Sequence, residues 1–219
     1  MFEIQISYPC AVSDQTDEGY STAYEWVKSR LDEEQHITLW VPQKNILNNN
    51  KFLKSLSSDE DVNIVTGKEG CMYKAHGPVL AMYPESADLG KITYGRGVTA
   101  LCIVQGLVDP LETWIQETSS KVLHDFTFQL EEPSLTPEIV CGLKRITNRI
   151  NHNNTIAAGY EKKQVVSELL RLHDAAEYLP PHRAMQWCAA RGWRGDNLKK
   201  LGGYIQNINN GSRPKMPVC

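Results

Sequence analysis

The chain has 219 residues, of which 41% are hydrophobic and 22% charged, and its formal net charge at pH 7 is −3. This composition is typical of a globular protein and excludes a disordered chain, a collagen-like fibre and a disulfide-stabilised scaffold. No apolar run approaches the roughly 18 residues that a membrane span needs. The first residues show no secretory signal, so we expect a cytoplasmic protein without a membrane partner.

Alternating strands and helices are predicted over residues 1–130. Apolar and polar periodicity places the strands at residues 2–8, 36–41, 61–66, 77–83 and 98–105. Helical spacing indicates helices at residues 19–33, 51–56, 86–94 and 109–123, the last one capped by Asp109. Residues 98–105 form the most continuously apolar stretch, which is typical of a central strand covered on both faces. The pattern predicts a three-layer α/β sandwich with a mostly parallel sheet of about five strands.

Strand patterns end near residue 131, and only amphipathic helices are predicted beyond it. They are expected at residues 137–150, 161–178, 181–191 and 197–210, and Thr136 is expected to cap the first of them. We therefore divide the chain into an α/β domain, residues 1–130, and an all-helical C-terminal subdomain, residues 131–219.

The two parts carry opposite charge. Residues 1–130 hold 10 Lys and Arg against 18 Asp and Glu, a net charge of −8, whereas residues 131–219 hold 13 against 8, a net charge of +5. Such asymmetry indicates an anionic partner for the basic part. It is explained equally by attraction between the two parts or by surfaces that are simply solvated.

The basic residues of the helical part suggest a nucleic-acid-binding surface. Lys144, Arg145 and Arg149 share one side of a predicted helix, away from its apolar stripe. Four more basic residues follow and alternate with Trp187, Trp193 and Tyr204: Arg191, Arg194, Lys199 and Lys200. Cations beside aromatic rings can bind phosphates while the rings stack on bases, although the same aromatic spacing also fits a helical core. Our leading hypothesis is a non-catalytic protein that binds nucleic acid through these helices.

A second hypothesis places an enzyme at the carboxyl ends of the strands, where open α/β sheets bind their ligands. Asp14 and Glu85 could hold a divalent metal or act as general acid and base, which suits a hydrolase of nucleotides or nucleic acid. Cys10 would become a candidate nucleophile if His76 came within hydrogen-bonding distance.

Other motifs are incomplete, and no cofactor is identified. The segment at residues 66–70 lacks the spacing of a phosphate-binding loop, and no glycine-rich fingerprint follows the first strand. The six cysteines form no CxxC pair, so no metal site is predicted from them. A third hypothesis is an interaction scaffold whose basic helices bind an acidic protein.

Overall fold

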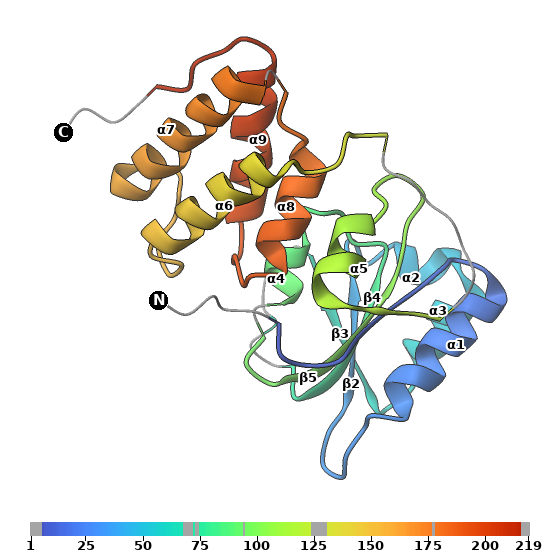
Figure 1. The fold of residues 1–219 in the computed structure, drawn as a ribbon. Coiled ribbons are helices and arrows are strands. Elements are labelled where there is room, and N and C mark those ends of the chain that lie inside the picture. The colour runs from blue at the N-terminus through green and yellow to red at the C-terminus, as the bar shows by residue number, and fades with distance from the viewer. Residues whose placement is uncertain are drawn as a thin grey trace.

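A computed structural model describes residues 6–67, 72, 75–93, 95–123, 131–176 and 178–215. Within them, six parallel strands form one sheet in the order β3-β2-β4-β5-β1-β6 (Figure 1). The strands in chain order are β1 (Cys10–Ser13), β2 (Ile37–Val41), β3 (Val62–Thr66), β4 (Gly77–Met82), β5 (Val98–Val104) and β6 (Lys121–Val122). The predicted α/β sandwich with a parallel sheet is confirmed, with one short strand more than expected.

Helices cover both faces of this sheet. In chain order they are α1 (Asp17–Lys28), α2 (Ile46–Asn49), α3 (Lys51–Leu56), α4 (Leu89–Ile92), α5 (Glu112–Thr118), α6 (Pro137–Arg149), α7 (Gly159–Ala176), α8 (Pro181–Ala189) and α9 (Asn197–Asn209). The core residues of α1, α2 and α3 pack on one face, and those of α4 and α5 pack on the other. The remaining helices, α6 to α9, form a bundle beyond α4 and α5 (Figure 1).

The first strand differs from the sequence-based prediction. Residues 6–8 are not in a strand and residues 2–5 lie outside the described part of the chain, whereas β1 covers Cys10–Ser13. All four of its residues are buried because β1 lies between β5 and β6. Alternation at residues 2–8 suggested a strand with one solvated face, but a strand inside a covered sheet needs small or apolar residues on both faces.

Helix ends follow the capping rules in some places and not in others. Thr136 caps α6 as predicted, since its hydroxyl accepts a hydrogen bond from Ile139 N at 3.3 Å. Asp109 does not cap α5, which begins after Leu111; the Asp109 carboxylate instead accepts a hydrogen bond from the Ser86 hydroxyl at 2.9 Å. A long-range partner therefore replaced the local one.

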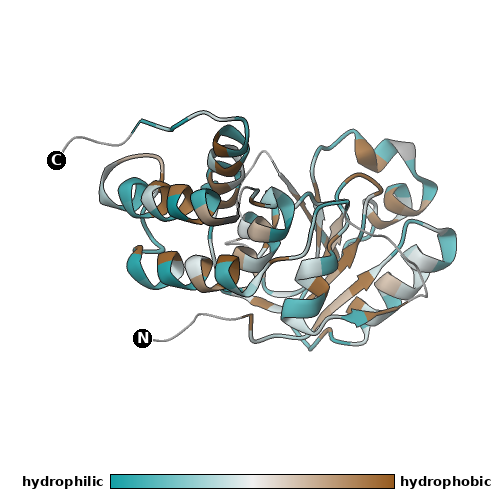
Figure 2. Ribbon diagram, turned by 45° about the horizontal axis from the view of Figure 1, so that its top comes forward, coloured by the Kyte–Doolittle hydropathy of each residue, from teal (hydrophilic) through white to brown (hydrophobic). Residues whose placement is uncertain are grey.

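The α/β part and the helical bundle share one hydrophobic core. A single cluster of buried residues runs from strand residues such as Leu101 through Trp114 of α5 to Trp187 of α8. Within the bundle, Gly142 of α6 lets α7 approach closely, because a Cβ at this position would lie 2.5 Å from Leu172 Cδ1. Figure 2 shows apolar residues concentrated on the strands, while the bundle helices carry both apolar and polar sides.

Ion pairs join the two oppositely charged parts. Arg183 Nη2 lies 2.9 Å from Glu112 Oε2, and Arg191 Nη2 lies 2.7 Å from Glu117 Oε2. Attraction within the chain thus accounts for part of the charge asymmetry. Among the described residues, no helix is both long and apolar enough to cross a lipid bilayer.

Candidate functional site

Two of the predicted nucleic-acid-binding residues are engaged inside the fold. Arg145 donates from Nε and Nη2 to Glu168 Oε1 of α7, at 3.0 and 2.8 Å. Burial opposes ionisation of Glu168, but hydrogen bonds from Arg171 and Arg145 outweigh it and lower the pKa of this carboxyl. Arg191 is buried, with its guanidinium 3.6 Å above the Trp187 ring and paired with Glu117. Both arginines join helices through carboxylates; Arg191 is buried, whereas the Arg145 side chain stays 36% exposed.

The other predicted basic residues lie at or near the surface. Lys144 and Arg149 are exposed on α6, and Lys199 is exposed on the first turn of α9. Arg194 and Lys200 are partly buried, and both line a pocket of about 330 Å³. We call this pocket the basic pocket.

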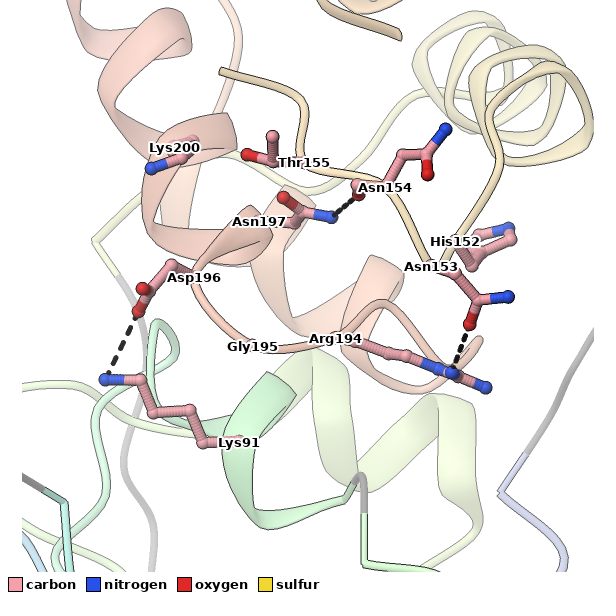
Figure 3. A pocket seen from close by; sticks show the side chains of 10 residues that line it. All are labelled: Lys91, His152, Asn153, Asn154, Thr155, Arg194, Gly195, Asp196, Asn197 and Lys200. Carbon is pink, nitrogen blue, oxygen red and sulfur yellow. Dashed lines mark hydrogen bonds and ion pairs between the residues drawn. The ribbon is translucent and has the colours of Figure 1, made fainter. Parts of the chain in front are cut away.

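The basic pocket lies between the bundle and α4 (Figure 3). It is lined by the loop after α6, by the turn between α8 and α9, by α9 itself and by one side chain of α4. Its residues are Lys91, His152, Asn153, Asn154, Thr155, Arg194, Gly195, Asp196, Asn197 and Lys200.

Hydrogen bonds hold the two loops of the basic pocket against each other. Asn197 is buried; its Oδ1 accepts from Ile156 N at 3.1 Å and its Nδ2 donates to the Asn154 carbonyl at 2.9 Å. Arg194 Nη1 donates to Asn153 Oδ1 at 2.6 Å, a contact drawn in Figure 3. Because both loops are tied by buried or charged groups, the pocket is preorganised before any ligand arrives.

Positive charge exceeds negative charge in this pocket. Lys91, Arg194 and Lys200 contribute three cations, against the single carboxylate of Asp196, whose Oδ1 lies 3.3 Å from Lys91 Nζ. The amino end of α9 also opens here without a side-chain cap, which adds the positive end of the helix dipole. Burial lowers the pKa of His152, which favours the neutral form of this ring.

Two of the three aromatic residues predicted to stack on bases are buried. Trp187 and Trp193 are 0% and 1% exposed, so neither can stack on a base. Trp193 Nε1 donates to Thr147 Oγ1 at 3.0 Å, and the Tyr204 hydroxyl donates to the Ile156 carbonyl at 2.9 Å. Trp187 and Trp193 belong to the bundle core, the alternative that their spacing also allowed, and Tyr204 is partly buried against that core.

Asp14 and Glu85 lie beyond the carboxyl ends of β1 and β4, as expected, whereas Cys10 lies within a strand. The Asp14 carboxylate accepts from the Thr16 hydroxyl at 2.6 Å and so orders the turn before α1, while Glu85 lies exposed beyond β4. No group of three or more His, Cys, Asp and Glu that could hold a metal ion occurs among the described residues. Cys10 is buried within β1 rather than in a loop, and burial raises the pKa of its thiol to about 12, which opposes the thiolate form.

Lys91 was not foreseen from the sequence. It belongs to the acidic part and lies in a four-residue helix, α4, with no basic neighbour in the sequence to mark it. Its ion pair with Asp196 spans more than 100 residues of chain, so only the docking of the bundle places it at the pocket.

Comparison with known proteins adds one partial match. Residues 135–217 resemble a domain of unknown function, DUF1889. This segment contains α6 to α9 and therefore every basic-pocket residue except Lys91. No curated protein and no solved structure matches the chain.

Proposed function

We propose that this protein binds nucleic acid through phosphate contacts centred on the basic pocket. The observation that carries the proposal is the excess of three cations over one carboxylate around a preorganised cavity of about 330 Å³. Phosphate oxygens accept hydrogen bonds, and this cavity offers Lys and Arg donors beside the amino end of a helix.

The surrounding surface extends the same chemistry. Lys199 stands beside Lys200 on α9, and Arg149 ends α6 three residues before His152 of the pocket. A strand seated with one phosphate in the pocket can place its neighbouring phosphates near these exposed cations. Since Trp187 and Trp193 are buried, we expect contacts to the phosphate backbone and little dependence on base sequence.

Fluorescence anisotropy with labelled single- and double-stranded DNA and RNA across a salt series tests the proposal. The log–log slope of affinity against salt should be roughly −0.7 to −0.9 for each phosphate neutralised. The double variant Arg194→Gln/Lys200→Gln should weaken binding and make this slope shallower by roughly 1.4 to 1.8, because two contacts are lost. Glutamine at position 194 retains a donor for Asn153 and so spares the loop.

A matched control removes the same charge elsewhere. Lys44 and Lys54 are exposed on the other side of the sheet, near and on α3, so Lys44→Gln/Lys54→Gln should leave both affinity and slope unchanged. Equal losses in the two double variants would overturn the assignment to the pocket, and so would an absence of binding at low salt. Equally tight binding of a labelled polyglutamate of the same charge would favour an acidic protein partner instead.

A further inference from the structure

The charge of the basic pocket matches a doubly charged ligand. Its lining holds three cations, Lys91, Arg194 and Lys200, against the single carboxylate of Asp196, which leaves a net charge of +2. Burial lowers the pKa of His152 and so favours a ring that does not add to this sum. An internal phosphate of a nucleic acid carries one negative charge, whereas a terminal phosphate monoester carries about −1.5 to −2 at pH 7. The pocket is therefore better matched to a strand end than to the middle of a strand.

The three cations reach the pocket from separate segments of the chain. Lys91 lies on α4, Arg194 in the turn between α8 and α9, and Lys200 on α9 itself. A phosphate monoester has three oxygens that accept strong hydrogen bonds, one more than an internal diester. Three acceptors on one phosphorus atom can meet charged donors that converge from three segments.

Two of these residues have donors that such a phosphate could use. An ammonium group has three N–H donors, so Lys91 retains donors beyond its contact with Asp196. In the described part of the chain, no carboxylate lies within ion-pair distance of Lys200, which is partly buried beside the pocket. A bound phosphate would supply the opposite charge that Lys200 lacks within the fold.

Contacts between the lining segments restrict how a strand can enter. Arg194 Nη1 meets Asn153 Oδ1 at 2.6 Å and joins the turn before α9 to the loop after α6. Lys91 Nζ lies 3.3 Å from Asp196 Oδ1 and joins the same turn to α4. Figure 3 shows these two contacts on either side of Gly195. A strand that ran through the pocket would need two openings, whereas a strand end needs only one, so both contacts can stay intact around an end.

We propose that the basic pocket binds the terminal phosphate of a nucleic acid strand, a monoester at its 5′ or 3′ end, between Lys91, Arg194 and Lys200. This inference rests on the proposed function, and it narrows the substrate from any nucleic acid to one with a phosphorylated end. The neighbouring phosphates of the bound strand lie toward exposed cations outside the pocket, such as Lys199 and Arg149.

Fluorescence anisotropy with one short single strand, labelled at an internal base, tests the proposal. Its three forms carry a 5′ phosphate, a 3′ phosphate or hydroxyls at both ends. We expect at least one phosphorylated form to bind about tenfold more tightly than the hydroxyl form, the effect of hydrogen bonds to a charged group. The form that gains affinity identifies which end the pocket takes. A hydroxyl-ended strand one nucleotide longer adds a phosphate without adding a phosphorylated end, so it should not reproduce the gain.

The outcomes separate this inference from the proposed function. Equal affinity of the phosphorylated and hydroxyl forms would overturn recognition of the strand end and leave nucleic-acid binding intact. The same gain from the longer strand would overturn it too, because any added phosphate would then suffice. An absence of binding by every form at low salt would overturn both proposals.

Two variants at neighbouring positions test the assignment to the pocket. Lys200→Gln removes a pocket cation and should remove most of the gain that the terminal phosphate gives. Lys199→Gln removes the same charge from an exposed residue of α9 that does not line the pocket. This control should lower the affinity of every form and leave the gain unchanged. An equal gain in the two variants would refute the assignment.

Discussion

The ion pair between Arg191 and Glu117 allows a quantitative test of how the helical bundle is held on the α/β part. The two side chains are 2.7 Å apart and unequally buried: Arg191 is 10% exposed and Glu117 is 29% exposed. The cost of removing one partner depends on the charge left behind, because a buried charge cannot recover its hydration. Removing the more exposed partner should therefore cost more free energy of unfolding.

Arg191→Met should cost about 1 kcal/mol, the net value of the lost hydrogen bonds. Methionine retains apolar contact with Trp187, and the remaining Glu117 carboxylate can turn toward water. Glu117→Ala should cost about 2–3 kcal/mol, somewhat less than the 3–5 kcal/mol of a fully buried pair, because the guanidinium loses its carboxylate in a place that water scarcely reaches.

Urea denaturation of both single variants and of the double variant measures these values. The shared core predicts one cooperative transition for the whole chain. Once methionine occupies position 191, Glu117→Ala should cost little, so the coupling energy between the two positions should be about 2–3 kcal/mol. A larger loss for Arg191→Met than for Glu117→Ala, or a coupling energy near zero, would refute the reasoning.

Three further predictions concern packing, pH and thiol reactivity. Gly142→Ala should lower the free energy of unfolding by about 1–3 kcal/mol because the new methyl group overpacks against α7. Gly203→Ala has open space around its Cβ and should stabilise α9 by about 0.5–1 kcal/mol. Equal effects of the two variants in thermal unfolding would contradict this. The hydrogen bond to the Asp109 carboxylate raises the pKa of His182 in the folded chain. The contribution of His182 to the free energy of unfolding should therefore be complete below its unfolded pKa of about 6.5 and disappear as pH rises through its folded pKa. If the stability difference between the wild type and His182→Gln grew with pH, the sign would be wrong. Iodoacetamide should label exposed Cys141 far faster than buried Cys10, measured by peptide mass spectrometry, and comparable rates would argue against the burial described for β1.

Local periodicity in the sequence determined most of the secondary structure. The predicted bounds of α3 at residues 51–56 match the structure, and the apolar stripes of α6 and α9 are buried as their spacing indicated. These features depend on neighbours within about four residues, which the sequence displays directly. The change from strands to helices near residue 131 and the parallel α/β architecture follow from the same local signals.

Tertiary structure alone decided which charged side chains remain available. Arg145 and Arg149 look equivalent in the sequence, yet Arg145 meets a carboxylate 23 residues away on α7, whereas Arg149 is exposed. Arg191 likewise meets a distant carboxylate, because its partner Glu117 is 74 residues away. Composition reports how many charges a chain carries, but docking of the helices on the sheet determines which are neutralised within the fold. For that reason the basic pocket, with Lys91 contributed by the acidic part, became visible only in the folded chain.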